Sequence, residues 1–208
     1  RRLIPDERAT LVISPCSSHP ARNWSARRYA AVADYAARTH GMRVILAGGR
    51  SEEERRMGAM IEAAGAPASA GAAGAPGARG ADSEAKSSIV NQIGKDTLPE
   101  MLGLLSRATV LISPDSGPVH MATMVGLPVI GLYAATRSAR AGPYYSRQWC
   151  VDKYDEAARM VFGTARENLP WTKKIERPGV MDLIEVQEVT DKLDALIAQS
   201  KVRTGSTR

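Results

Sequence analysis

The sequence predicts an α/β fold with an open, doubly wound sheet of parallel strands. Short runs of β-branched and aliphatic residues alternate along the chain with segments in which apolar residues recur at helical spacing. Successive strand–helix units of this kind form parallel strands joined by right-handed crossovers. The 208 residues are 44% apolar but only 5% aromatic, so we expect one domain with a core of Val, Ile, Leu, Ala and Met.

The chain opens with two strand–helix units. The apolar run at residues 9–15 (ATLVISP) ends in proline and is typical of a buried strand, and residues 43–49 (RVILAGG) form a similar run. Between these runs, Ser25 can cap a helix that ends at Gly41. A second helix is predicted at residues 51–64, with acidic residues in its first turn, where the helix dipole favours them.

An Ala-, Gly- and Pro-rich segment, residues 65–85, follows the second helix. It cannot bury enough side-chain surface to offset its ordering entropy, so we expect a flexible insertion on the surface. The strand–helix pattern resumes after it, and the prediction for residues 1–208 therefore remains a single domain.

The pattern continues to residue 133. Thr97 and Glu100 have the spacing of a capping box at the start of a helix. The apolar residues that we expect on the buried face of this helix are Leu98, Met101, Leu102 and Leu105. The other predicted segments are a strand at 88–94, a strand at 109–114, a helix at 117–126 and a strand at 128–133.

The pattern weakens over residues 134–179, where Arg, Gly, Pro, Tyr and Trp are frequent. A C-terminal amphipathic helix is predicted at residues 180–200, and residues 201–208 are expected to form a disordered tail. The apolar stripe of this helix must pack on another surface; it consists of Ile184, Val186, Val189, Leu193, Leu196 and Ile197.

Composition excludes several classes of protein. No apolar stretch reaches the roughly 20 residues of a transmembrane helix, and no signal-peptide core is present, so we expect a cytoplasmic protein. Cys16 and Cys150 lack metal-ligand spacing and are expected to be reduced, partly buried thiols. The net charge of +6 favours anionic partners, but Lys and Arg are scattered, so no nucleic-acid partner is expected. Motifs for a catalytic triad, a metal cluster or a Walker loop are absent, and no metal or cofactor is predicted.

Three loops follow predicted strands and should meet at one edge of the sheet. In the loop at residues 114–120, Ser116 can cap the next helix, and Gly117 lets a ligand approach the backbone, as in a phosphate site at a helix N-terminus. Asp115 can orient an arginine or bind sugar hydroxyls, and His120 can donate to a phosphate or sugar oxygen. An ordinary capped helix with a satisfied histidine explains the same residues equally well.

The other loops supply further candidates. Arg22, in the loop after the first strand, can pair with a diphosphate or be an exposed arginine at a helix entry. Glu52 or Glu53 can bind the two hydroxyls of a ribose or merely stabilise the helix dipole. Thr136, in the basic segment 135–149, can hold a ligand from the far side or belong to an ordinary basic loop.

Taken together, three stretches resemble the family 9 glycosyltransferases, the ADP-heptose:lipopolysaccharide heptosyltransferases and their relatives. The stretches are SPCSSHPARNWSARRYAAVADY, VILAGGRSEEERR and the long segment from IGKDTLPEM to SARAGPY, and the match runs over residues 11–145. The most specific part is DSGPVH at residues 115–120 with GLPV at residues 126–129, which resembles the family signature D-[ST]-G-x-x-H…G-x-P-V.

The resemblance implies the GT-B architecture, in which two Rossmann-like domains face a cleft, and it covers only the C-terminal one, which binds the donor. Arg22 takes the place of a basic residue that contacts the donor phosphates, and Glu52, or the residue after it, that of a ribose-binding Glu. The loop for the donor sugar and diphosphate is matched by Asp115, Ser116, Gly117 and His120. Before Thr136 the chain reads Ala-Ala, a departure from the Gly-Pro that is usual in the family.

This resemblance leads us to expect the donor-binding half of an inverting, metal-independent glycosyltransferase for lipopolysaccharide or a related cell-surface glycan, with an ADP-heptose-like donor. No catalytic residue is expected in this chain, because the general base of the family is an Asp of the N-terminal acceptor domain, which the sequence lacks.

The implied partners are a nucleotide-diphosphate sugar and, through the absent domain, a glycolipid acceptor, with peripheral association at the cytoplasmic face of the inner membrane. The final helix is expected to cross back to the absent domain; without that domain we expect its stripe to be partly exposed, or to pack on a neighbouring molecule and favour association. A non-catalytic nucleotide-sugar-binding or interaction module is the alternative function.

Overall fold

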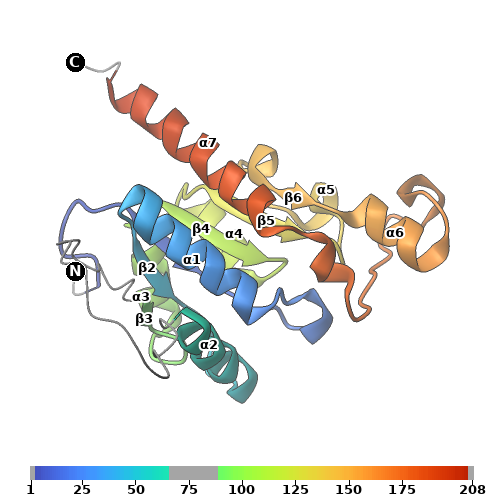
Figure 1. The fold of residues 1–208 in the computed structure, drawn as a ribbon, viewed down its shortest axis with the longest axis horizontal. Coiled ribbons are helices and arrows are strands. Elements are labelled where there is room, and N and C mark those ends of the chain that lie inside the picture. Colours follow the sequence, from blue (N-terminus) through green and yellow to red (C-terminus); the bar gives the residue numbers. More distant parts are fainter. Residues whose placement is uncertain (1–2, 66–88, 206–208) are drawn as a thin grey trace, which may run out of the picture.

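The computed structural model describes residues 3–65 and 89–205, with side chains up to residue 200. Its centre is a six-stranded parallel sheet with the strand order β3-β2-β1-β4-β5-β6 (Figure 1). The strands are β1 (Thr10–Ile13), β2 (Arg43–Leu46), β3 (Ile89–Asn91), β4 (Val110–Pro114), β5 (Val129–Tyr133) and β6 (Val151–Asp152). The predicted α/β class with parallel strands is confirmed.

The order of the strands reverses between β1 and β4. Leu11 in β1 is in register with Val44 of β2 on one side and with Val110 of β4 on the other. The chain leaves these two central strands toward helices on opposite faces of the sheet, which opens a crevice at their carboxyl ends.

Helices cover both faces of the sheet. One face packs against α1 (Ala26–His40), α2 (Glu52–Gly65), α6 (Tyr154–Phe162) and α7 (Val186–Gly205), and the other against α3 (Leu98–Leu105) and α4 (Gly117–Met124). Successive side chains of β1 point to opposite faces, so Leu11 and Ile13 belong to the first core and Val12 to the second.

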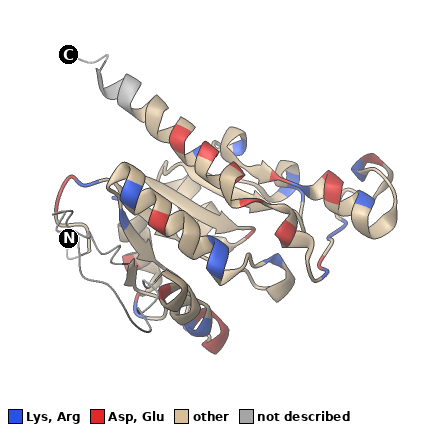
Figure 2. Cartoon of the chain, in the orientation of Figure 1, with Lys and Arg blue, Asp and Glu red and all other residues tan. Residues whose placement is uncertain are grey.

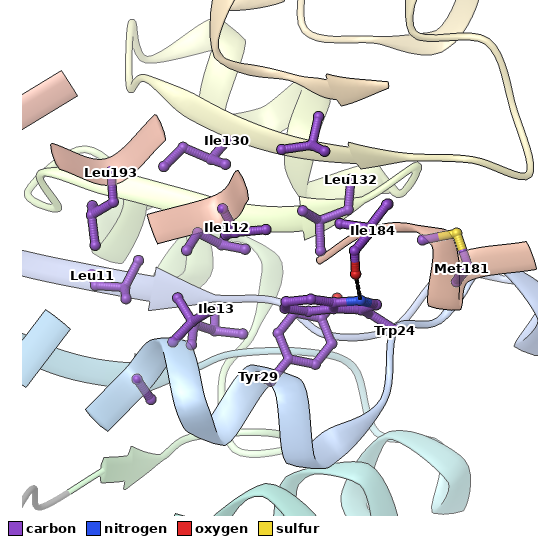
Figure 3. Packing of buried hydrophobic residues seen from close by; sticks show 14 of the residues in the cluster. Leu11, Ile13, Trp24, Tyr29, Ile112, Ile130, Leu132, Met181, Ile184 and Leu193 are labelled. Atoms are coloured by element: carbon purple, nitrogen blue, oxygen red, sulfur yellow. Dashed lines mark hydrogen bonds between the residues drawn. The ribbon is translucent and has the colours of Figure 1, made fainter. Parts of the chain in front are cut away.

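The first core joins segments from both ends of the chain (Figure 3). The rings of Trp24 and Tyr29 meet edge to face with their centroids 5.2 Å apart. The indole N–H of Trp24 donates to the backbone carbonyl of Ile184, 3.1 Å away, just before α7. The loop after β1 is therefore held against the C-terminal segment by packing and by a buried hydrogen bond.

Helix ends follow the local predictions closely. Ser25 caps α1 by accepting from the backbone N–H of Arg28, and Gly41 ends the helix in the left-handed region at φ 62°. Thr97 and Glu100 form the predicted capping box of α3, each side chain accepting from the backbone N–H of the other residue.

The buried face of α3 differs from the prediction. The helix buries Met101, Leu104 and Leu105, whereas Leu102 is only half-buried and Leu98 is 74% exposed. Leu98 is the first residue of the helix and lines a cleft. It fits the apolar period of the helix, but no other described segment packs over its side chain.

The weakly patterned residues 134–179 contain regular structure that the sequence analysis does not predict, namely α5 (Ser138–Ala141), β6 and α6. The C-terminal helical region begins with a 3-10 turn (Val180–Leu183) before α7. The backbone of α7 runs to Gly205 and so enters the segment predicted as a disordered tail; residues 206–208, and all of the predicted insertion except Gly65, lie outside the described residues.

The apolar stripe of α7 packs within this chain. Val189 and Leu193 are fully buried, and Leu196 and Ile197 nearly so, against α1 and the sheet (Figures 1 and 3). The expectation that this stripe is partly exposed or packs on a neighbouring molecule is therefore wrong, because α1 and the sheet cover it.

Along the described helices, Lys and Arg occur together with Asp and Glu (Figure 2). Among the described residues, none of the helices has the length and the apolar character that a membrane span requires.

Candidate functional site

A cleft of about 910 Å³ lies at the carboxyl ends of β1, β2 and β4. Four segments build it: the loops after β1 and β2, and the first turns of α3 and α4. The residues that line it are Ser14, Cys16, Ser17, Ser18, Gly48, Gly49, Arg50, Ser51, Glu53, Glu54, Asp96, Thr97, Leu98, Met101, Ser116, Gly117, Pro118 and Met121. The cleft thus occupies the crevice that the strand order creates.

The N-terminus of α4 opens into this cleft without a side-chain cap. Ser116 has the extended backbone of an N-cap residue, but its hydroxyl makes no capping hydrogen bond. Instead it lies 2.7 Å from the hydroxyl of Ser113, which donates its only proton to the carbonyl of Ser14. Ser116 must therefore be the donor to Ser113, and the predicted side-chain cap is absent.

Gly117 is the first residue of α4, so its backbone N–H has no acceptor inside the helix. The residue is exposed, and a Cβ at this position would meet nothing within 4 Å. An anion in the cleft can therefore reach the uncapped N–H groups at the positive end of the helix dipole.

The acidic residues that follow β2 have different roles. Glu54 accepts from the Gly49 N–H and from the Ser51 hydroxyl, both at 2.7 Å, and a Cβ on Gly49 would come within 2.7 Å of its carboxylate. Glu53 lines the cleft and accepts from the side-chain amide of Asn23 at 3.3 Å. Glu52 is exposed and does not line the cleft.

Large apolar side chains form an apolar wall of the cleft. They are Leu98 and Met101 of α3 and Met121 of α4. Three apolar side chains on one wall, with carboxylate and backbone N–H groups around them, suit a ligand with a flat apolar part and a charged part.

Arg22 lies beside the cleft in a cluster of charges. Its Nε and Nη2 donate to the same oxygen of Glu176, at 2.8 and 2.5 Å, and its Nη1 is 3.5 Å from the Asp115 carboxylate. Glu176 is a member that the sequence analysis missed, since it is 154 positions away and no local pattern marks it.

The opposite charges in this cluster stabilise each other's ionised forms. The side chains of Arg22 and Asp115 are only 11% and 16% exposed. Partial burial alone would raise the pKa of Glu176, but the hydrogen bonds and positive charge of Arg22 outweigh it and lower that pKa. The Arg22–Glu176 pair is therefore ionised at neutral pH.

Cys16 lines the cleft but is unsuited to nucleophilic chemistry. Burial, together with the nearby carboxylates of Glu54 and Glu53, raises the pKa of its thiol to about 12. Cys16 and Cys150 are both free. In the described part of the chain, no group of three His, Cys, Asp or Glu side chains is arranged to hold a metal ion.

Comparison with known proteins agrees with this geometry. The model of Glycosyltransferase family 9 (heptosyltransferase) matches residues 2–171, most of the chain. The chain belongs to glycosyltransferase family 9.

Among curated family 9 relatives, the lipopolysaccharide core heptosyltransferase OpsX of Haemophilus influenzae is 32% identical over 195 residues, which cover 94% of this chain and 50% of the relative. Among solved structures, the E. coli ADP-heptose lipopolysaccharide heptosyltransferase II matches with a TM-score of 0.65 and 20% identity, over 94% of this chain and 48% of that one. A family 9 glycosyltransferase of Veillonella parvula matches with a TM-score of 0.64 and 20% identity, over 92% and 46%. The chain thus spans about half the length of these relatives.

Only some of the site residues predicted from the family 9 signature lie in or beside the cleft. Ser116 and Gly117 line the cleft, and Asp115 lies beside it next to Arg22. His120 is exposed on α4 and does not line the cleft, and its imidazole makes no hydrogen bond or ion pair with any residue that the structure describes.

Thr136 is also outside the cleft, at 3% exposure in the loop after β5. The adjacent Arg137 donates to the carbonyls of Arg166 and Leu169, at 2.6 and 3.0 Å, and its guanidinium lies 4.6 Å from the centre of the Tyr154 ring. This loop is therefore tied to the segment after α6, and its arginine is not free to hold a ligand in the cleft.

Proposed function

We propose that this chain is the donor-binding half of an inverting, metal-independent family 9 glycosyltransferase, and that its ligand is a nucleoside diphosphate sugar of the ADP-heptose kind. The uncapped N-terminus of α4, open to the cleft at Gly117, is the observation that carries the proposal. The names of two fold neighbours support the class of donor: one is an E. coli heptosyltransferase, WaaC, with ADP, and the other is a heptosyltransferase, TibC, in complex with ADP-D-β-D-heptose.

Each part of the proposed donor has a matching surface. The diphosphate meets the N–H groups at the start of α4, beside Arg22, and the ribose hydroxyls donate to the Glu53 carboxylate, one oxygen of which also accepts from Asn23. The base packs on the apolar wall that begins at Leu98. We assign the donor sugar to the solvent-exposed surface at the N-terminus of α4, near Asp115 and His120.

In the proposed reaction the acceptor hydroxyl oxygen forms a bond to the anomeric carbon of the donor sugar. The bond from that carbon to the diphosphate oxygen breaks on the opposite side, so the configuration inverts and the nucleoside diphosphate leaves with the electron pair. The α4 dipole and Arg22 stabilise the negative charge that grows on this leaving group. The hydroxyl proton goes to a base in the acceptor domain.

We further propose that the complete protein transfers the sugar to a lipopolysaccharide-type glycolipid at the cytoplasmic face of the inner membrane, in keeping with the name of its curated relative. The acceptor site and the base belong to a part of the protein outside this sequence. Transfer assays with full-length protein test this step; binding of the donor without any turnover would favour the non-catalytic binding module.

A matched pair of glycine substitutions tests the donor site. Gly117→Asp places a carboxylate at the start of α4, where the helix dipole tolerates it but a diphosphate is repelled. We expect ADP to raise the melting temperature of the wild-type protein by several degrees and to have little effect on this variant.

Gly103→Asp is the control, because a Cβ at Gly103 also meets nothing within 4 Å and the residue lies outside the cleft. Its response to ADP should equal that of the wild type. An unchanged response in Gly117→Asp, or no response of the wild type to any ADP-, UDP- or GDP-sugar, would contradict the assignment of the site.

A further inference from the structure

Two protein carboxylates contact the guanidinium of Arg22. Glu176 accepts from both Nε and Nη2, which form one edge of the guanidinium. This edge has the geometry that binds a carboxylate or a phosphate through two N–H groups. A phosphate that approached Arg22 from the cleft would meet Glu176 on the edge that it needs.

The charge balance of the cluster also opposes an anion. Arg22 contributes one positive charge, whereas Asp115 and Glu176 contribute two negative charges, so these three side chains together carry −1. A diphosphate adds further negative charge. Favourable binding beside Arg22 therefore requires that one carboxylate withdraw from it.

Glu176 is the carboxylate that can withdraw. Asp115 directly follows β4, and because its backbone carbonyl accepts from the Ser17 hydroxyl at 2.7 Å, its short side chain can move the carboxylate only a small distance from this anchored backbone. The side chain of Glu176 is 23% exposed, and the backbone next to it is anchored through the Ile175 N–H, which donates to the Ala135 carbonyl at 2.8 Å. A rotation of the Glu176 side chain therefore suffices, and the backbone need not move.

His19 offers a second partner to the withdrawn carboxylate. Its Nδ1 accepts from the Ala21 N–H at 3.2 Å, so the proton of the neutral imidazole is on Nε2. This Nε2 lies 3.7 Å from the second carboxylate oxygen of Glu176. A small movement of Glu176 away from Arg22 can convert this approach into a hydrogen bond.

We propose that Glu176 is an internal counter-ion that occupies the phosphate-binding edge of Arg22 and is exchanged for a diphosphate oxygen when the donor binds. This inference rests on the proposed function of the cleft. Glu176 competes with the diphosphate, so it lowers the affinity for the donor and for the nucleoside diphosphate product, and its return to Arg22 assists release of that product.

Calorimetric titration of the full-length protein and its variants tests the exchange. Glu176→Gln keeps the shape and one acceptor oxygen but removes the charge, and we expect its Kd for ADP to be about three- to five-fold lower than that of the wild type. Adenosine, which has no phosphate, should bind both proteins equally. A structural effect of the substitution would change the binding of adenosine as well.

The control is Glu167→Gln, which removes the same charge from a nearby exposed ion pair with Arg166, at 3.0 Å. It should leave the affinity for ADP unchanged. In a double-mutant cycle, Glu176→Gln should lose its effect when Arg22 is replaced by Gln, because the competition acts through Arg22.

The possible results separate this inference from the proposed function. Weaker binding of ADP by Glu176→Gln would show that Glu176 positions Arg22 for the phosphate, and unchanged binding would show that it plays no part; either result overturns the exchange. A wild-type protein that binds no nucleoside diphosphate would overturn the proposed function and the exchange together.

Discussion

At the scale of single residues, hydrogen bonds within the protein decide which carboxylates beside the cleft remain available to a ligand. Glu53 and Glu54 are adjacent in sequence. The carboxylate of Glu54 accepts hydrogen bonds from its own loop, whereas that of Glu53, among the residues described, accepts only from Asn23 and can accept further hydrogen bonds from a ligand. Glu52, one residue earlier, faces solvent. One helical residue is a rotation of about 100°, so neighbours in the first turn of α2 necessarily face different surroundings.

The thiol of Cys16 provides a test at this scale. Its ordinary pKa is 9.0 and burial raises it to about 12, a difference of three pH units, so the thiolate fraction at pH 8 falls about a thousandfold. Burial likewise raises the pKa of Cys150 to about 12. We expect a thiol-specific reagent to label the native protein very slowly at pH 8 and to label both cysteines rapidly in denaturant.

Single substitutions of Cys16 and Cys150 by Ser identify which thiol gives each phase of the reaction. A fast phase in the native wild-type protein that disappears in Cys16→Ser would contradict the burial of this thiol.

At the scale of secondary-structure elements, the helix ends are stabilised by local interactions. Gly41 ends α1 with a left-handed backbone, a conformation that costs an L-residue roughly 1 kcal/mol, and no neighbour crowds the position. Gly103 lies inside α3, where the backbone is helical and a Cβ would also meet open space. The two glycines differ in backbone conformation and not in packing.

Alanine substitutions at these two positions should therefore have opposite effects. We expect Gly41→Ala to lower the free energy of unfolding by about 1 kcal/mol and Gly103→Ala to raise it by about 0.5–1 kcal/mol. Chemical denaturation with an unchanged m-value measures both. Two effects of the same sign would mean that packing, and not backbone conformation, controls the response.

At the scale of the whole molecule, α7 joins the end of the chain to its beginning. Leu193 of α7 is fully buried and packs in the same core as Leu11 of β1 and Ile130 of β5 (Figure 3). The buried hydrogen bond from Trp24 to the Ile184 carbonyl fastens the loop after β1 to the segment that leads into α7. The loop after β1, which contributes residues to the cleft, is therefore held in place by contacts between segments from both ends of the sequence.

Substitutions of two leucines distinguish residues that stabilise the core from residues that bind a ligand in the cleft. We expect Leu193→Ala to cost about 2–5 kcal/mol of stability, since it leaves a cavity among buried side chains. Leu98→Ala, at a position 74% exposed, should cost about 0.5 kcal/mol or less but weaken the binding of ADP. Equal losses of stability would show that the cleft wall is also part of the core.

Local signals account for the parts of the fold that the sequence predicted well. The caps at Ser25 and Thr97 and the end of α1 at Gly41 depend on residues within one helical turn, and the central strands are long enough to show as apolar runs. Strand β6 has only two residues, which are too few to show a period, so the sequence does not predict it.

Long-range contacts account for the differences in the site. Glu176 lies 154 positions from Arg22 and no spacing rule connects them. Leu98 fits the apolar period of α3, but whether a neighbour covers it depends on the path of other segments. Ser113 donates its only hydroxyl proton to the carbonyl of Ser14, 99 positions earlier, so its hydroxyl accepts from Ser116, and the Ser116 hydroxyl does not cap α4.

The sequence by itself determined the α/β class, the central strand–helix units, their caps and the family of this protein, because these depend on periodicity and on residues close together in the chain. Only the tertiary structure decided what covers the apolar face of α7, which of Glu52 and Glu53 reaches the cleft, and that Arg22 is paired with Glu176. The physical reason is that burial and ion pairing depend on the distances between segments, which the chain acquires only when the sheet brings its loops to one edge.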